Sequence, residues 1–380
     1  MQSDEFRTNL RKTTSCLTSS EHYGITWPTM VEQQIPFSSF TTEHALQFLR
    51  FGKCRPLREG EVIYSYAKGF LQPNDTKLYF RPVFEPFYNN CINRDQLPEM
   101  RYPSEAEKRF KLCGKKYIML FDFKAWYDQL PLDDAVHNCH VIRLKEPVEW
   151  EGKLHTLLAL TKDPMGATHS AHTAQTITWA IGEPLFHMNV DIVTMIDNFI
   201  VATDDPEAFV QAVQTFIQRC DEFGAVLNDR ESYPSDPAAI LKMGRETAST
   251  WTSILGAEYK DGLVRNTEKN LKNLNDAYLR LQRAASDPSV VVTRRHIAAL
   301  ISLAFYMARI IDVRVAQHFP MIRLHQKMSS MRGSWDSAYK PSINEMNNLA
   351  KLVGIIMPNV PVRPTFAGQR LQRLRRHHHL

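Results

Sequence analysis

The sequence lacks the paired cysteines that mark a disulfide framework or a structural zinc site. Its six cysteines are scattered without Cys-x-x-Cys spacing, a pattern typical of reduced thiols in an intracellular protein. The run His-Asn-Cys-His at residues 137–140 contains metal-ligand residue types, but no second cluster in the sequence completes a tetrahedral site. We therefore expect neither a disulfide framework nor a zinc centre.

Long apolar runs are also missing from the sequence. The longest, residues 297–308, is about half of the ~20 residues that a helix needs to cross a bilayer, so we expect no membrane partner. The N-terminus has no apolar signal-peptide core, and Asp4 and Glu5 disfavour a transit peptide within residues 1–20. We expect an intracellular protein, cytoplasmic or nuclear, that begins with a loosely organised extension over residues 1–45.

The net charge of +5 conceals a strong asymmetry along the chain. From residue 265 onward there are 19 Lys or Arg and 6 Asp or Glu, whereas the first 264 residues hold 27 basic and 35 acidic residues. A basic C-terminal part is typical of a protein that binds a polyanion with one end. Solvated helix faces would give the same asymmetry, so charge alone leaves both interpretations open.

Two carboxylates stand at the margins of predicted strands. An apolar run of strand length at residues 117–121 ends in Asp122. A second largely apolar unit, residues 190–202, has Asp197 and Asn198 between two β-rich runs, which predicts a hairpin with a polar turn. A charge in such an apolar setting needs compensation, which a pair of divalent cations bound by both carboxylates would provide. The alternative is a turn residue and a strand terminator without chemistry.

The pattern around these strands predicts an α+β fold. Small residues and Thr from Gly166 to Ile181 predict a helix, and a second helix begins at the cap Asp205 and ends at Gly224. An extended run at residues 226–227 completes the order strand, helix, hairpin, helix, strand of a ferredoxin-like split βαβ layer. A further hairpin is predicted over residues 140–158, and helices over residues 266–311 and after residue 341.

Five segments resemble the motifs of reverse transcriptases, and they occur in that family's order over residues 76–260. They are residues 121–132 (Phe-Asp-Phe-Lys-Ala-Trp-Tyr-Asp-Gln-Leu-Pro-Leu), 164–175 (beginning Pro-Met-Gly), 195–198 (Met-Ile-Asp-Asn), 224–228 (Gly-Ala-Val-Leu-Asn) and 254–256 (Ile-Leu-Gly). Upstream of them, Lys77 and residues 81–86 (Arg-Pro-Val-Phe-Glu-Pro) are similar to a strand of the family's fingers. The resemblance is closest to retrotransposons of the long-terminal-repeat or tyrosine-recombinase kinds. It implies a right-hand polymerase with a ferredoxin-like palm, fingers and a helical thumb or connection.

The resemblance implies a catalytic centre made of Asp122, Asp197 and Asn198. Asp122, the backbone carbonyl of Phe123 and Asp197 would hold two Mg²⁺ or Mn²⁺ ions. Asn198 stands where the family has a second aspartate, and its neutral amide would weaken metal binding. Glu231 stands where the family has a lysine, which disfavours a general acid at that position.

The resemblance also implies substrate-binding residues. Lys77 and Arg81 would hold the nucleotide triphosphate, the alternative for Lys77 being an ordinary surface lysine. Tyr127 would lie under the sugar and exclude a 2′-hydroxyl, the alternative being a core tyrosine. Two pairs complete the set: Met165 and Gly166 as the floor of the nucleotide pocket, and Leu255 and Gly256 as the primer grip.

The expected organisation is an N-terminal extension (1–45), fingers and palm (46–265), a helical thumb or connection (266–340) and a basic C-terminal segment (341–380). No set of four carboxylates follows residue 330, so we expect no RNase H domain within the sequence. The expected thumb carries six cations that are candidates for phosphate contacts, Arg294, Arg295, Arg309, Arg314, Arg323 and Lys327.

These features predict an RNA-directed DNA polymerase whose partners are an RNA template, a DNA or RNA primer and dNTPs. An alternative from another class is a catalytically decayed polymerase fold that binds nucleic acid without chemistry, as Asn198 and Glu231 indicate. A third is an RNA-dependent RNA polymerase, which the aromatic ring of Tyr127 disfavours.

Overall fold

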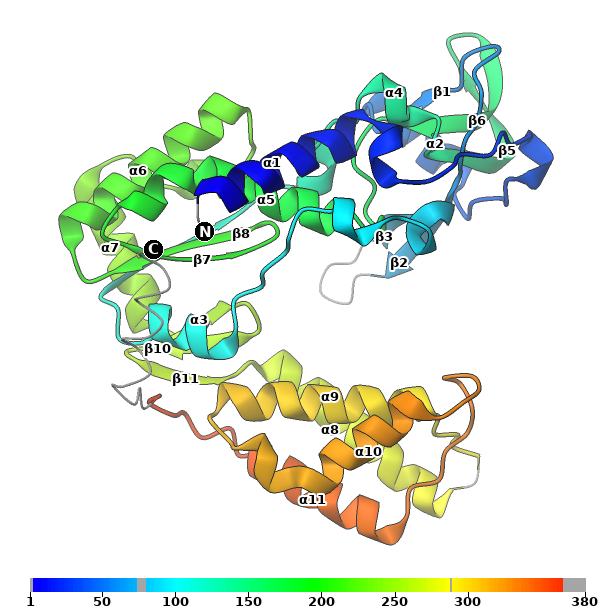
Figure 1. Cartoon of the computed structure of the whole chain (residues 1–380). Helices are drawn as coiled ribbons and strands as arrows, with labels where there is room; N and C mark the ends of the chain where they lie inside the picture. Colours follow the sequence, from blue (N-terminus) through cyan, green and yellow to red (C-terminus); the bar gives the residue numbers. More distant parts are fainter. Residues whose placement is uncertain (1–2, 74–79, 288, 365–380) are drawn as a thin grey trace.

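A three-stranded antiparallel sheet forms the centre of the structure, a computed structural model that describes residues 3–73, 80–287 and 289–364 (Figure 1). Its strands are β4 (Tyr117–Asp122), β8 (Asn198–Thr203) and β7 (Asp191–Met195), in that order across the sheet. Side chains alternate along β4, as a strand requires. Met119 and Phe121 enter the core beneath the helices, and Ile118 and Leu120 enter a second core on the opposite face.

Two helices cover one face of this central sheet, as the sequence predicts. They are α5 (Ser170–Gly182) and α6 (Pro206–Phe223). Asp205 caps α6 by accepting hydrogen bonds from the amides of Glu207 and Ala208, and Gly224 ends it with φ of +65°. Rings of Phe121, Phe199 and Phe216 pack together in the core between the sheet and α6.

The last strand of the expected split βαβ layer is shorter than predicted. The segment after α6 pairs with the end of β4 through one antiparallel bridge, Phe123 with Leu227. Across the sheet, this segment lies next to β4, which is followed by β8 and then β7. This is the order that the split βαβ plan requires. Helix α7 (Pro237–Ser249), which the sequence pattern did not predict, packs along β4.

A second region of strands lies at one end of the central sheet (Figure 1). It contains a sheet with the order β1-β6-β5 and a β2–β3 hairpin, and helix α2 (Thr42–Arg50) packs on β5. The predicted hairpin is confirmed as β5 and β6, which turn at Glu151 and Gly152, both with positive φ. The strand bounds are β1 (Cys54–Pro56), β2 (Ala67–Pro73), β3 (Phe80–Pro86), β5 (Val141–Trp150) and β6 (Lys153–Leu160).

The N-terminal residues are more ordered than we expected. Residues 3–18, predicted as part of a loose extension, form helix α1 (Ser3–Thr18), which packs against α5 and the short α4 (Asp134–His137). The reason is burial on one face: Asn9, Thr13 and Cys16 are all covered. Lys12 ties the helix to the carbonyls of Asp95 and Leu97.

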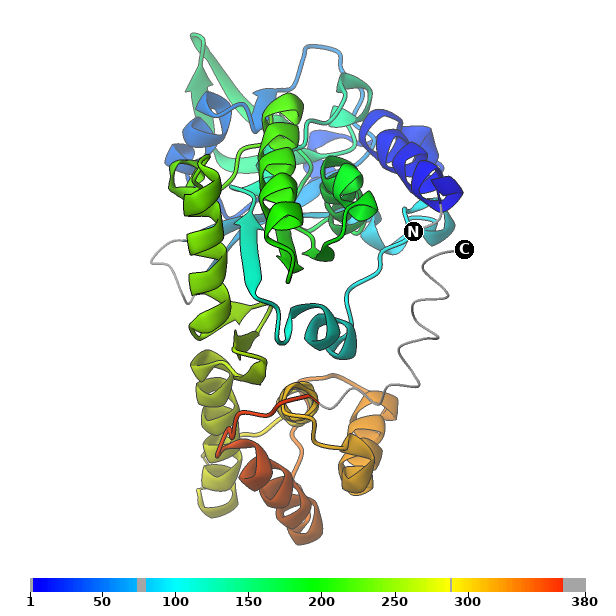
Figure 2. The same cartoon turned by 90° about the vertical axis from the view of Figure 1, so that its left-hand side faces the viewer.

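A helical bundle follows the sheets and lies beside them (Figures 1 and 2). It contains α8 (Glu268–Ser286), α9 (Arg294–Ile310), α10 (Phe319–Ser330) and α11 (Ile343–Ile356). A small sheet, β9 (Thr252–Ile254), β10 (Ala257–Lys260) and β11 (Leu263–Asn266), joins the bundle to α3 (Glu105–Leu112) and α7. The chain then returns to this sheet, where Val362 pairs with Val264. Within the described residues, no helix combines the length and apolarity needed to span a bilayer.

Candidate active site at the ends of two strands

Asp122 and Asp197 lie next to each other in the structure, although they are 75 positions apart in the sequence. Asp122 ends β4 opposite Asn198, the first residue of β8. One residue further, the amide of Phe123 donates a hydrogen bond to the carbonyl of Asp197 (2.9 Å). Both carboxylates are half-buried. The hairpin turn consists of Ile196 and Asp197 rather than Asp197 and Asn198, because Asn198 pairs with Met195 as part of β8.

The hairpin turn is held from beneath by α5. Ile196 has φ of +56°, an unfavourable conformation for a β-branched residue. Its amide donates to the side-chain carbonyl of Gln175 (2.7 Å), and its carbonyl accepts from the hydroxyl of Thr178. The amide group of Gln175 also donates to Thr194 on β7 (2.9 Å). The sequence pattern placed these residues on a helix but did not reveal this role, because their partners are backbone atoms of a distant turn.

Asn228 is a second residue whose role the sequence did not reveal. Its side-chain amide donates a hydrogen bond to a carboxylate oxygen of Asp122 (2.7 Å). The nearby amide of Asn198 donates to Asp197 in the same way (2.9 Å). Each carboxylate therefore has a neutral amide partner, and neither amide cancels the negative charge. The sequence gives two signals for it: it ends the resembling segment 224–228, and it is a polar residue directly after the apolar run at 226–227.

The two carboxylates repel each other. The pKa of Asp197 is raised above its ordinary value, first by burial and then by the charge of Asp122. Arg81 on β3 opposes this effect, because its positive charge lowers the pKa of Asp197. Arg81 is exposed at the start of the strand. Its charge thus acts on the carboxylate site.

The donor atoms at this site fit a hard divalent cation better than zinc. Two carboxylates, the Asn198 side chain and backbone carbonyls supply oxygen, the element that Mg²⁺ prefers. The described residues contain no group of three or more His, Cys, Asp or Glu that would hold a metal through protein side chains alone. A bound Mg²⁺ or Mn²⁺ would therefore take further ligands from water or substrate.

Tyr127 lies in a short helical turn, residues 126–129, which follows the end of β4. The turn begins after Ala125, which has φ of +46°. The ring of Tyr127 is half-buried and packs against the core of the central sheet. The pKa of its hydroxyl is raised, first by burial and then by the charges of Asp163 and Asp197. Tyr127 therefore packs against the core, as a core tyrosine would, and its hydroxyl is also affected by the charge of Asp197.

Met165 and Gly166 form a turn that β3 holds in place. The carbonyl of Met165 accepts a hydrogen bond from the amide of Phe84 (2.8 Å), and the side chain of Asn89 donates to the carbonyl of Gly166 (2.9 Å). Gly166 has φ of +123°, and a Cβ there would lie 2.6 Å from the carbonyl oxygen of Phe84. Only glycine fits. Lys77, the other predicted triphosphate ligand, lies outside the described residues.

Leu255 and Gly256 form the turn between β9 and β10, where the sheets meet the helical bundle. Leu255 has φ of +49° and Gly256 has φ of +86°. The turn lies on different elements from Asp122 and Asp197, which belong to β4 and the β7–β8 hairpin. Leu255 nevertheless packs against a core that Ile118 of β4 and Ile200 of β8 also enter, so the predicted primer grip contacts the sheet that carries the carboxylate pair.

The six predicted phosphate-binding cations divide into three groups. Arg294 is only 4% exposed; it donates to the carbonyl of Met331 (2.6 Å) and stacks on Trp335, so its charge is directed into the protein. Two others form ion pairs, Arg295 with Asp336 and Lys327 with Glu345. The remaining three, Arg309, Arg314 and Arg323, are exposed and show no ion pair with any residue in the described part of the chain.

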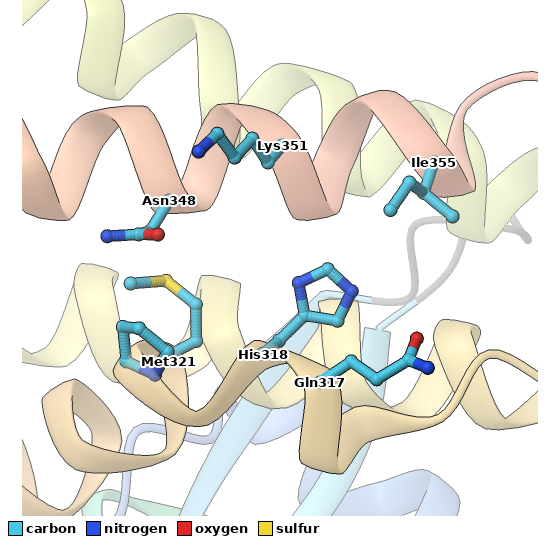
Figure 3. Close-up of a pocket in the computed structure, with 7 residues that line it drawn as sticks. Gln317, His318, Met321, Asn348, Lys351 and Ile355 are labelled. Carbon is cyan, nitrogen blue, oxygen red and sulfur yellow. The ribbon is translucent and has the colours of Figure 1, made fainter.

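A pocket of about 420 Å³ opens in the helical bundle (Figure 3), and its lining includes no residue of the strands that carry the carboxylates. It lies between α11 and the segment before and within α10, and its lining includes His318, Met321, Asn348 and Lys351. These residues mix one cation with amide and apolar groups. The pocket brings none of the predicted site residues together.

No family model and no curated protein matches the sequence. The fold, in contrast, is similar to that of a solved foamy viral protease–reverse transcriptase in complex with double-stranded DNA. The TM-score is 0.58 with 12% sequence identity, over 95% of this chain and 58% of that chain. This chain thus spans less than two thirds of the length of the chain it matches. At this identity, the likeness shows a reverse-transcriptase-like fold that mixes helices and sheets.

Proposed function

We propose that this chain is the polymerase portion of a reverse transcriptase, of the retrotransposon kind, which copies an RNA template into DNA by adding dNTPs to a primer. The observation that supports this most is the pairing of two half-buried carboxylates, Asp122 and Asp197, at the ends of neighbouring strands. Their mutual repulsion is what bound divalent cations would relieve. The likeness to a reverse transcriptase solved with double-stranded DNA supports a duplex as the partner.

Asp122, Asp197 and the carbonyl of Phe123 would hold Mg²⁺ or Mn²⁺, with Asn198 as a neutral neighbour. Such ions, when bound, stabilise the charge that develops on the oxygens of a transferring phosphoryl group. The chain's own residues would orient the substrate. Arg81, whose charge already reaches Asp197, would face the triphosphate, and Tyr127 would lie against the sugar.

Primer extension tests this proposal. The assay uses an RNA template, a DNA or RNA primer, either Mg²⁺ or Mn²⁺, and dNTPs or rNTPs in separate reactions. Metal-dependent extension with dNTPs in preference to rNTPs is the expected result. Extension with rNTPs alone would instead assign the chain to RNA synthesis, and no extension with either metal would contradict the proposal.

A second candidate function is nucleic-acid binding without catalysis. Asn198 favours it, because its amide donates to Asp197 and leaves the site one carboxylate poorer than a full metal centre. The exposed cations Arg309, Arg314 and Arg323 would supply phosphate contacts, whose affinity falls steeply with salt. A chain that binds duplex in a salt-dependent manner but never binds a dNTP in the presence of Mg²⁺ would favour this function over polymerisation.

A further inference from the structure

Three side chains from different helices converge on the turn at Leu255 and Gly256. The hydroxyl of Tyr306 on α9 donates to the carbonyl of Leu255 (3.0 Å), and the ammonium group of Lys108 on α3 approaches the same oxygen (3.4 Å). The amide of Asn270 on α8 donates to the carbonyl of Gly256 (2.8 Å). One turn is thus bound both by the sheet-bearing part of the chain and by the helical bundle, at the junction visible in Figure 1.

The conformation of this turn depends on these contacts. Leu255 adopts a left-handed conformation that costs an ordinary residue free energy unless its surroundings enforce it. Gly256 is just as constrained, since a Cβ at this position would lie 2.3 Å from the hydroxyl oxygen of Tyr306. The hydroxyl therefore both binds the turn and occupies the space that any larger residue would need.

Lys108 is a buried cation, and its burial indicates a specific task. It is 4% exposed, pairs with Glu105 one helical turn away, and lies 6.0 Å from the centre of the Tyr306 ring. An uncompensated charge at such a site would be costly, so the pair with Glu105 is what allows Lys108 to reach Leu255. Burial, followed by the charge of Glu105, raises the pKa of Tyr306 to about 12, so its hydroxyl keeps the proton it donates at neutral pH.

We propose that Tyr306 and Lys108 are positioning residues: they fix the turn at Leu255 and Gly256 between the sheets and the helical bundle, and thereby set where a primer end lies relative to Asp122 and Asp197. This inference rests on the proposed polymerase function. Neither residue belongs to the carboxylate site itself, so their effect would be on the placement of the primer rather than on nucleotide binding or on the chemical groups.

Tyr306→Phe tests the inference, because it removes one hydroxyl and keeps the ring. The matched control is Tyr278→Phe on α8, a half-buried tyrosine that packs against the core of the bundle instead of bonding to the turn. Primer extension is measured with a trap that prevents rebinding, together with the KM for dNTP. We expect Tyr306→Phe to add about three- to tenfold fewer nucleotides per binding event, the effect of one lost hydrogen bond, with an unchanged KM for dNTP. Tyr278→Phe should behave as the parent.

A second measurement requires no catalysis. A primer with 2-aminopurine at its 3′ end is bound as a duplex, and its fluorescence reports whether the end is stacked or displaced. Tyr306→Phe should change this signal relative to the parent, and Tyr278→Phe should not. If the parent extends primers but both variants match it in extension and fluorescence, the positioning role is wrong while the polymerase proposal stands. If the parent does not extend, the polymerase proposal fails and the fluorescence decides the role of Tyr306; a parent that binds no duplex overturns both.

Discussion

The side chain of Asn228 is bonded to the carboxylate of Asp122 at 2.7 Å, and its backbone amide is bonded to the carbonyl of the same residue at 2.8 Å. The segment after α6 is therefore anchored to the end of β4 by two bonds from one residue. This arrangement fixes one oxygen of Asp122 and leaves the other oxygen for a ligand. Asn228 thus orients the carboxylate without adding to its charge.

Asn228→Ala should lower primer extension by about three- to tenfold, because loss of a charge-assisted hydrogen bond lets the carboxylate of Asp122 rotate away from its position. The Mg²⁺ concentration for half-maximal rate should rise. Steady-state extension over a Mg²⁺ series measures both quantities. Asn273→Ala, on the exposed face of α8, is the control. Equal Mg²⁺ dependence in the two variants would show that Asn228 does not orient Asp122.

Gln175→Leu should destabilise the hairpin turn. The substitution keeps much of the side-chain volume but leaves the amide of Ile196 and the hydroxyl of Thr194 without this partner. The hydroxyl of Thr194 keeps its bond from Trp179 (2.6 Å), so only the amide of Ile196 is left unsatisfied. A buried donor left unsatisfied costs about 1–3 kcal/mol, and the free energy of unfolding should fall by that amount. Denaturant unfolding measures the loss. Gln211→Leu, at an exposed position of α6, should change it by less than about 0.5 kcal/mol. Similar losses of unfolding free energy in Gln175→Leu and Gln211→Leu would show that the bonds of Gln175 do not stabilise the hairpin turn.

Gly166→Ala should be strongly destabilising, because the added Cβ meets the carbonyl of Phe84 and the backbone φ of +123° excludes a side chain. We expect a loss of about 2–4 kcal/mol in unfolding free energy, together with loss of dNTP binding. Gly354→Ala provides an internal contrast. Gly354 lies within α11 in open space, so alanine there should stabilise the helix by up to about 1 kcal/mol. The expected outcome is that Gly166→Ala lowers the free energy of unfolding and Gly354→Ala raises it.

The raised pKa of Asp197 predicts how stability depends on pH. The folded state holds this proton more tightly than the unfolded chain, so without metal the stability falls as pH rises from the ordinary aspartate range through the raised pKa. Asp197→Asn removes the repulsion with Asp122. It should therefore raise the metal-free melting temperature at neutral pH by about 2 °C and flatten the pH dependence.

Addition of Mg²⁺ should reverse the order of the two melting temperatures, so that the parent melts above Asp197→Asn. Binding to the folded parent should raise its melting temperature, and the same addition should leave Asp197→Asn nearly unchanged. Melting curves over a pH series, with and without Mg²⁺, measure all four states. An Asp197→Asn chain that melts below the parent without metal would mean that the two carboxylates do not repel each other as the structure indicates.

The apolar pattern predicted the central sheet well, because a strand buried on both faces leaves few alternatives. The run that ends at Asp122 became β4, and the run around Asp197 became a hairpin. The turn itself was misplaced by one residue. Asn198 is polar and so looked like a turn residue, but its pairing with Met195 makes it part of β8, and Ile196 takes the strained position instead. Hydropathy cannot reveal a strain that Gln175 and Thr178 relieve from a distant helix.

The N-terminal part and the cations were predicted less well. Helix α1 is polar over much of its length, and it is held to the protein by its buried face of Asn9, Thr13 and Cys16 and by the bonds of Lys12 to two backbone carbonyls. Arg294 looked like a surface cation next to Arg295. Its partners, the carbonyl of Met331 and the ring of Trp335, lie about 40 residues away in sequence. A count of charges carries no information about such partners.

Metal-dependent primer extension by Asp122→Ala and Asp197→Ala tests the central claim most directly. Both are compared with the parent and with Asp221→Ala, an exposed acidic residue at the end of α6 that lies outside the carboxylate site. The account predicts that the parent and Asp221→Ala extend a primer on an RNA template with dNTPs, whereas each of the other variants loses at least about 100-fold in rate, as removal of a group that stabilises the transition state does. If Asp122→Ala and Asp197→Ala extend the primer as well as the parent, the two carboxylates are not its catalytic centre.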